Sequence, residues 1–294
     1  MLKRLAALAA FKLSVFLKPR VSDEFFKQYS RLISSDVTAE ELAEYPQEAE
    51  ELFPDRPITA QRYKILQEIC QNDPIALTAI QLYLLCLMEE RAVDLLREGL
   101  GVAQGLTIQT AGRVACPGEE TIELTTRLRA AFDRVELLLQ AEPEREWWNA
   151  PFQLDSRLAA WLSGDDTPDR ELEALCTVAA PGDPLFPATL TGKQVEQVTP
   201  MLEGFSVVHI SGETGSGRRH FARHAARMLG RELLIVPFAA VGEEGLLNPR
   251  LWRRVVRELL LTNRLLCLAD VECPAEKRTA RLPSLLRRLE RELA

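Results

Sequence analysis

The sequence predicts a mixed α/β protein, in which a mostly helical N-terminal region precedes a unit of three layers, a sheet between helices. Three observations support this class. Residues 59–100 carry apolar positions at spacings of three and four, as helices do. Residues 205–211 form a β-branched run that leads directly into a glycine-rich loop and then a helix. Two further apolar runs, at 231–237 and 265–269, supply strands for the same sheet.

The composition is that of a soluble globular protein. The chain has 294 residues, 47% hydrophobic and 27% charged, which is enough for two domains with their own cores. The net charge is −7, with the acidic excess in residues 1–211 and a basic excess in residues 212–294. This asymmetry favours packing of an acidic part on a basic part, within the chain or between subunits. The acidic whole disfavours a nucleic-acid partner.

The cysteines and the N-terminus indicate a cytoplasmic protein without a transmembrane segment. The six cysteines lie mostly in apolar runs without metal-ligand spacing, so we expect reduced core residues. Residues 1–17 look like a signal peptide, but Lys12 breaks the apolar stretch and no small-residue cleavage site follows. We expect an amphipathic helix that docks on the protein or on a partner. Membrane association is the alternative.

The chain is expected to fold as two domains joined by a linker. Helices followed by apolar runs at 135–140 and 151–154 have the order of a winged-helix module, with a short strand expected at 106–110. The same order is common in small α+β domains that bind nothing. The expected parts are a helical N-terminal segment (1–60), a helical and winged-helix-like domain (61–163), a Pro/Gly-rich linker (164–200) and the α/β unit (201–294).

The glycine-rich loop between the run 205–211 and the helix ending at Leu229 predicts a P-loop. Strand, glycine loop and helix in succession are the context that this motif requires. The glycines let backbone N–H groups point inwards, where they and the positive end of the helix hold phosphate. The alternative is a glycine turn without any ligand. The predicted nucleotide-binding residues are Gly212, Glu213, Thr214, Gly215, Ser216, Gly217, Arg218 and Arg219.

Two arginines replace the residues on which P-loop hydrolysis depends. The usual motif ends in lysine, which reaches the β- and γ-phosphates, and in serine or threonine, whose hydroxyl binds Mg²⁺. Here Arg218 and Arg219 stand at these positions. A planar guanidinium does not match a compact ammonium, and Arg219 adds positive charge where Mg²⁺ should sit. We therefore expect metal-assisted hydrolysis to be badly impaired, whereas binding of ATP or another anion can survive.

The run 265–269 ends in a carboxylate, as the strand that holds the Mg²⁺-bound water does in P-loop ATPases. Asp270 is the predicted metal-facing and catalytic residue, and Glu272 is the candidate for the acid that activates water. Any buried strand can end in aspartate at a turn. However, Asp270 follows Gly217 by 53 residues, with a strand and a helix between them, which makes the two motifs a fairly specific pair.

From Pro151 onward the chain resembles AAA-family ATPases, in particular the group associated with bacterial contractile injection systems. The resemblance rests on residues 151–164, the proline-rich connector after them and the loop Gly212–Arg219. Residues 75–150 look like that group's winged-helix region more loosely, and residues 1–60 match nothing in it. The resemblance implies a cytoplasmic ATPase with ATP and Mg²⁺ as cofactors, which assembles into rings and remodels or positions protein partners.

The chain departs from this family at its end as well as in the loop. Only 22 residues follow Glu272, where the family's sensor residue, arginine finger and helical lid should come. The family's sensor strand lies between the P-loop strand and the strand before Asp270, so we expect a gap in the sheet or exposed strand edges. A shortened, degenerate pseudo-ATPase, or the first part of an interrupted or split gene, explains both departures.

Two functions of different classes stay open. The first is an ATP-binding protein of AAA descent, with weak or no hydrolysis, that acts in protein remodelling or assembly. The second is an interaction scaffold without nucleotide, whose helices bind partner proteins and whose core is a relic. Either one can form a homo-oligomer or ring. A zinc site at His220 and His224 lacks a companion acid. We expect a solvated face or a subunit contact, rather than a DNA footprint, from Arg250, Arg253, Arg254 and Arg257.

Overall fold

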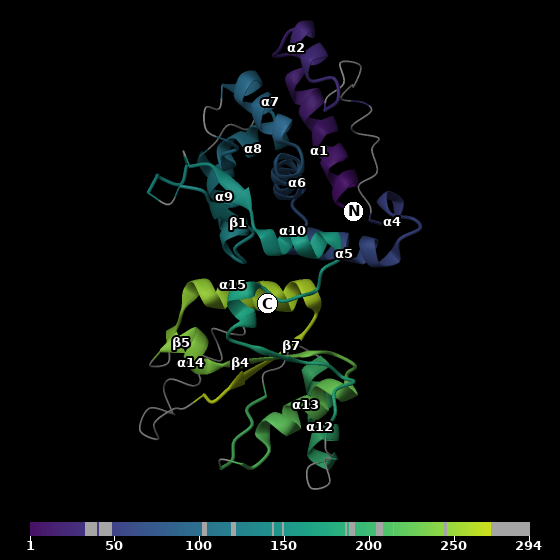
Figure 1. The fold of residues 1–294 in the computed structure, drawn as a ribbon, viewed down its shortest axis with the longest axis vertical. Helices are drawn as coiled ribbons and strands as arrows, with labels where there is room; N and C mark the ends of the chain where they lie inside the picture. Colours follow the sequence, from purple (N-terminus) through teal and green to yellow (C-terminus); the bar gives the residue numbers. More distant parts are fainter. Residues whose placement is uncertain are drawn as a thin grey trace. The chain divides into compact units, whose positions relative to one another are not determined.

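The chain divides into two compact units, Met1–Thr167 and Pro168–Ala294, which are described one at a time (Figure 1). The computed structural model describes residues 1–32, 40, 49–101, 105–118, 122–142, 144–148, 150–185, 187, 192–203, 208–213, 215–243 and 246–271. Helices and strands are both present, which confirms the mixed α/β class. None of the helices in the described ranges is both long and apolar enough to cross a bilayer.

The first unit is mainly helical, with one short two-stranded ribbon. Strands β1 (Leu138–Gln140) and β2 (Phe152–Leu154) pair antiparallel, with Leu138 opposite Leu154. Both runs were expected to form this ribbon, so that expectation is confirmed. The helices of the unit are α1 (Leu2–Leu17), α2 (Asp23–Gln28), α4 (Ala49–Leu52), α5 (Pro57–Ile69), α6 (Pro74–Met88), α7 (Glu90–Leu100), α8 (Ile108–Ala115), α9 (Ile122–Asp133) and α10 (Ser156–Ser163).

Helix α6 is the centre of the first unit. It begins where the Asp73 carboxylate accepts a hydrogen bond from the backbone N–H of Ile75 (2.9 Å), with Pro74 at the first helical position. Every residue from Ala76 to Leu85 is buried, because α1, α7, α8, α9 and β2 all pack against this helix. A helix that is apolar on all sides can be stable in water only when neighbours surround it in this way.

Helix α1 packs into the same core, so the expectation that it docks on the protein is confirmed. Leu5, Leu8 and Leu13 are almost fully buried, and the helix contacts α6 and α8. Lys12 interrupts this apolar surface, and its Nζ donates a hydrogen bond to Thr78 Oγ1 at 2.7 Å. Burial of the ammonium lowers the pKa of Lys12 to about 8.

The short strand expected at residues 106–110 is wrong, because Thr107 starts a helix there. Its hydroxyl oxygen accepts a hydrogen bond from the backbone N–H of Thr110 (3.1 Å) and thereby caps α8. Capping satisfies an N–H group that an extended conformation would leave to a neighbouring strand. Only Leu106 keeps a strand-like contact, since its carbonyl accepts from the backbone N–H of Phe152 at 3.0 Å.

The second unit contains a three-stranded sheet. Its strands are β3 (Thr177–Ala179), β4 (Leu233–Pro237) and β7 (Leu265–Ala269), in the order β3-β4-β7, with β3 antiparallel and β7 parallel to β4. Helix α15 (Pro249–Thr262) connects the parallel strands, as such crossovers require. The remaining elements are α11 (Arg170–Glu173), α12 (Gly192–Glu203), α13 (Arg218–Met228), α14 (Phe238–Val241) and the hairpin β5 (Gly242–Glu243) and β6 (Leu246–Leu247).

Helices cover both sides of this sheet. Helix α15 lies on one side, and α12 and α13 lie on the other (Figure 1). On the α13 side, Ala226 packs against Leu233 and Ala179, while Leu234 and Val236 of β4 point to the opposite face and are fully buried. The expected linker 164–200 contributes α11, β3 and most of α12 to the second unit.

The strand expected at residues 205–211 is wrong over its described part, 208–211, which has no regular secondary structure. A β-branched run becomes a strand only when a neighbouring strand pairs with its N–H and C=O groups. No strand of the described sheet pairs with residues 208–211. Strand β4 pairs instead with β3 and β7, so both of its edges are already taken.

Candidate functional site

The described part of the glycine loop is a turn that leads into α13. The backbone N–H of Ser216 donates to the Glu213 carbonyl at 3.1 Å, and Gly215 has a φ of +85°. A Cβ on Gly212 would lie 2.5 Å from the Ser216 hydroxyl oxygen, so a side chain there would force that hydroxyl to move. Thr214 lies outside the described residues. The loop therefore depends on glycine at more than one position.

Gly217 is the N-cap residue of α13, with a φ of +82°. It has no side chain to cap the first N–H groups of the helix, and the first turn contains no acidic residue. Unpaired N–H groups and the helix dipole make such an end positive, and Arg218 and Arg219 add two charges to it. Asp270 offsets the Arg219 charge, so the helix dipole and Arg218 are what leave this end positive.

The structure brings the predicted phosphate-binding and metal-facing residues together through one ion pair. Arg219, in the first turn of α13, places a guanidinium nitrogen Nη2 against Oδ2 of Asp270, the first residue after β7. Both side chains are about half exposed, at 57% and 54%. Asp270 has a φ of +56°, a conformation that aspartate adopts more readily than most residues. Glu272 lies outside the described residues.

The contact itself was not expected, since sequence reasoning assigned Arg219 to phosphate and Asp270 to Mg²⁺. The signal that could have predicted it is the opposite charge of two residues at positions that Mg²⁺ normally bridges. Near this pair, burial raises the pKa of the Cys267 thiol, Arg219 lowers it and Asp270 raises it.

The residues at this position do not fit a P-loop magnesium site. Mg²⁺ requires hard oxygen ligands in octahedral geometry, and the motif normally provides a serine or threonine hydroxyl beside the aspartate. Here that hydroxyl is replaced by the Arg219 guanidinium, which already contacts the Asp270 carboxylate. Within the described ranges, no group of three or more His, Cys, Asp and Glu side chains is arranged to hold a metal. Asp270, which was predicted to face Mg²⁺, thus faces the Arg219 guanidinium.

His220 and His224 lie side by side on α13. Their Nε2 atoms are 3.0 Å apart, which is the distance of a hydrogen bond between one protonated and one unprotonated nitrogen. The rings are nearly perpendicular, with centroids 4.5 Å apart. The pair thus satisfies itself by a mutual contact, in keeping with the absence of a companion acid in the sequence.

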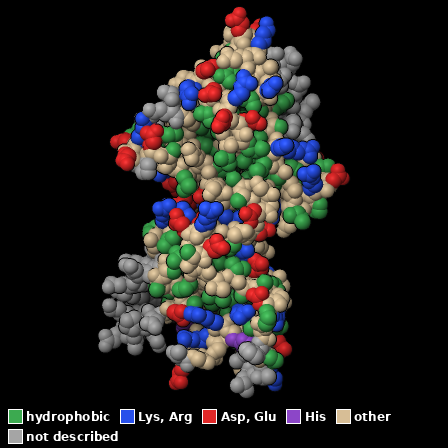
Figure 2. All heavy atoms as spheres, viewed as in Figure 1, with side chains coloured by type: hydrophobic (Ala, Val, Ile, Leu, Met, Phe, Trp, Pro, Cys, Tyr) green, Lys and Arg blue, Asp and Glu red, His purple; other side chains and the backbone are tan. Residues whose placement is uncertain are grey.

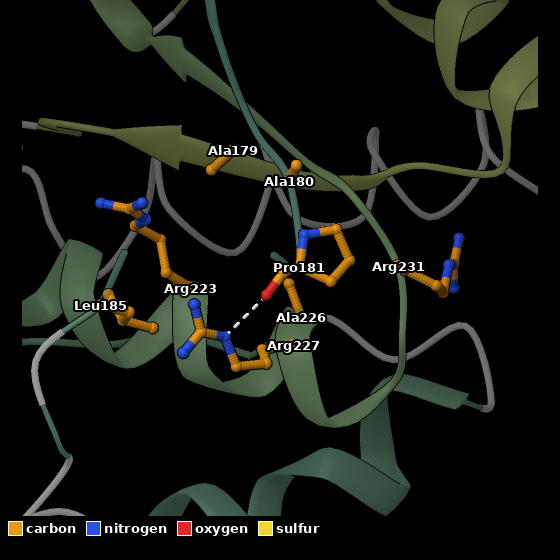
Figure 3. A pocket seen from close by; sticks show the side chains of 8 residues that line it. All are labelled: Ala179, Ala180, Pro181, Leu185, Arg223, Ala226, Arg227 and Arg231. Carbon is orange, nitrogen blue, oxygen red and sulfur yellow. Dashed lines mark hydrogen bonds between the residues drawn. The ribbon is translucent and has the colours of Figure 1, made fainter. Parts of the chain in front are cut away.

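A shallow hollow lies along the C-terminal half of α13, away from the predicted loop residues (Figure 3). It leaves essentially no enclosed space for a water molecule, whereas small-molecule pockets usually exceed about 300 Å³. Arg227, one of the residues that line it, is already hydrogen-bonded within the chain, because its Nε donates to the Pro181 carbonyl at 2.8 Å. The hollow is lined by Ala179, Ala180, Pro181, Leu185, Arg223, Ala226, Arg227 and Arg231.

The expected solvated face on α15 is wrong for Arg254 and Arg257, which are buried, whereas Arg250 is exposed and Arg253 is half-buried. Arg257 is fully buried and Arg254 is 6% exposed, and both pair with Asp169, at 2.6 and 3.1 Å. Arg254 and Arg250 also approach Glu171, at 3.3 and 3.5 Å. These arginines anchor the start of α11 on α15. On the face seen in Figure 2, positive and negative side chains are interspersed rather than gathered into one basic area.

Comparison with protein-family models, with curated proteins and with solved structures gave no match for this chain.

Proposed function

We propose that the second unit is a degenerate P-loop module of AAA descent that binds ATP or ADP through the glycine loop and hydrolyses it weakly or not at all. The carrying observation is the Arg219–Asp270 contact, which joins the first turn of the glycine-loop helix to the carboxyl end of a parallel strand. Ligands of open α/β sheets bind outside the carboxyl ends of parallel strands. The two motifs therefore meet where a P-loop protein holds phosphate.

The parallel strands support the same proposal. Strand β4, helix α15 and strand β7 form a β-α-β crossover directly after α13, as the P-loop helix and the next two strands do in this class. The loop retains the glycines with positive φ that such a turn needs, at Gly215 and Gly217. Hydrolysis is impaired because Arg219 supplies no hydroxyl for Mg²⁺.

Protein partners are part of the proposal, through α6, α8, α9 and the ribbon β1–β2, the region that the sequence predicts to be winged-helix-like. The basic residues of α9, the helix that would be the recognition helix, are occupied within the unit. Arg127 approaches Asp73 at 3.4 Å, and Arg129 pairs with Asp133 at 2.6 Å. This arrangement favours a protein contact over DNA.

The test is calorimetric titration of the purified chain with ATP and ADP, with and without Mg²⁺. Gly217→Asp puts a carboxylate at the N-terminus of α13, where it repels phosphate, and should abolish binding. Gly230→Asp is the matched control, because Gly230 also has positive φ (+64°) and open surroundings but lies beyond the other end of α13. Binding that survives in Gly217→Asp, or is lost equally in both variants, would contradict a phosphate site in the loop.

The second candidate is a scaffold that binds partner proteins and no nucleotide. It is favoured by the Arg219–Asp270 pair being charge-compensated without any ligand. Nucleotide that binds the folded protein raises its melting temperature, by the equivalent of about 2.7 kcal/mol at a hundredfold excess over Kd. An unchanged melting temperature at millimolar ATP and ADP supports the scaffold over the nucleotide-binding module.

A further inference from the structure

We infer that the Arg219 guanidinium is a built-in cation that takes the place of Mg²⁺ against Asp270, so that this site accepts a nucleotide in its metal-free form. The inference rests on the proposed nucleotide binding and specifies which form of the ligand binds. It follows from the disagreement between a P-loop magnesium site and the residues present.

Arg219 and Asp270 both lie on elements whose positions the sheet fixes. Arg219 is the second residue of α13, and α13 packs directly on β7. Asp270 follows the last residue of β7, Ala269, which is buried and paired with Pro237 of β4. The two elements that carry the pair are therefore held by the sheet, and the ion pair spans the gap between them.

The charges of Arg219 and Asp270 explain why this site disfavours Mg²⁺. A hydroxyl and a free carboxylate present a net charge of −1 to a cation, whereas Arg219 and Asp270 together present none. A divalent ion would have to separate this pair and then lie beside a guanidinium that cannot lose its charge. Both side chains are about half exposed, so the pair leaves the loop open to solvent and to an anion.

The ligand that matches this arrangement is a polyphosphate without its divalent ion. Mg²⁺ on ATP cancels part of the phosphate charge and brings a positive ion to a position that already holds one. Metal-free ATP or ADP keeps its full negative charge and meets the N-terminus of α13 and Arg218, while Arg219 stays paired with Asp270. Arginine binds phosphate oxygens through its planar fork without any metal.

The test compares Kd for ATP and ADP in excess EDTA with Kd in excess Mg²⁺, by calorimetry on the full chain. The wild type should bind equally well or more tightly in EDTA. Arg219→Thr restores the hydroxyl and releases Asp270, so its binding should become tighter with Mg²⁺ by at least about tenfold. Adding Asp270→Asn to Arg219→Thr should remove that gain, because the carboxylate is then gone.

Arg223→Thr is the matched control, since it removes another arginine of α13, one turn further along, whose nearest acid is Asp183 at 3.8 Å. It should keep the metal response of the wild type. Circular dichroism and a thermal melt of each variant show whether the fold is retained.

Tenfold tighter wild-type binding with Mg²⁺ would overturn the built-in cation and leave nucleotide binding intact. The same holds if Arg219→Thr binds nucleotide but gains no metal dependence. If neither wild type nor Arg219→Thr binds ATP, ADP or pyrophosphate under any condition, both the inference and the proposed function are overturned.

Discussion

Arg257 donates from Nη2 to Oδ2 of Asp169 at 2.6 Å, with the arginine fully buried and the aspartate 7% exposed. Arg254 contacts the same carboxylate with one nitrogen at 3.1 Å from each oxygen. Asp169 thus pairs with two buried guanidinium groups, Arg254 has Glu171 as a second acid, and these contacts fix the start of the second unit on α15.

Asp169→Asn should destabilise the second unit by about 3–5 kcal/mol, because two buried cations lose their shared counter-charge. Urea unfolding followed by circular dichroism measures the change. Glu171→Gln is the control, since Glu171 is 49% exposed and approaches the same helix, and it should cost less than about 1 kcal/mol. An equal loss of unfolding free energy in the two variants would show that the buried Asp169 pairs stabilise the fold no more than the exposed Glu171 contacts do.

Lys12 should make the protein more stable as the pH rises from about 8 towards 10.5. Its pKa is about 8 in the folded chain against 10.5 in the unfolded chain, so between these values the unfolded chain binds more protons. This difference in pKa corresponds to about 3 kcal/mol of unfolding free energy.

Lys12→Met removes this contribution, so it should be more stable than the wild type at pH 7.5, with the difference shrinking towards pH 10.5. Buried thiols act in the opposite direction in both proteins, because burial raises the pKa of Cys70 to about 12. Subtracting the two urea-unfolding series cancels that effect. A difference that stays constant from pH 7.5 to 10.5 would mean that the pKa of Lys12 is not lowered in the folded chain.

Cys70 should resist modification in the native protein at pH 8. Its side chain is 1% exposed and burial raises its pKa to about 12, so both access and thiolate are lacking. Peptide mapping after iodoacetamide treatment, with and without urea, measures this. Cys116, which is only half-buried, is the internal comparison. Cys70 modified as quickly as Cys116 without urea would contradict its position in the core.

Thr107→Ala should destabilise the first unit by about 1 kcal/mol, because it removes the hydroxyl that caps α8. Thr107→Ser retains the hydroxyl and should be close to wild type. Thermal unfolding of the three proteins separates a cap from a packing role. Equal losses for alanine and serine would indicate that the methyl group of Thr107, rather than its oxygen, matters.

Local sequence patterns predicted the long helices and strands. They failed where a segment becomes a strand only by pairing with a strand far along the chain. Helices α5, α6 and α7 and strands β4 and β7 were expected because their apolar runs are long and bounded by proline, glycine or aspartate. Strand β3 was not expected, since its three residues become a strand only by pairing with β4, 58 residues away at Thr177 and Ile235. The converse holds for residues 208–211, which have strand-like side chains but pair with no strand of the described sheet.

The candidate site divides in the same way. The glycine positions and the acid after β7 were predicted because each lies within a short local pattern. The Arg219–Asp270 contact joins two patterns about fifty residues apart, and the Asp169 pairs join a short helix to the middle of α15. Such contacts depend on which charged groups the fold brings together, and the spacing of residues along the chain does not predict this.

The two units differ in how soon their strands can meet during synthesis. The ribbon of the first unit pairs Leu138 with Leu154, 16 residues apart, and can close almost as soon as both strands leave the ribosome. The sheet of the second unit must wait, because β3 has no partner until β4 emerges and β7 follows later still. Closing longer loops costs more entropy, and such topologies fold more slowly. During translation, the first unit can thus complete its core while β3 is still an unpaired strand.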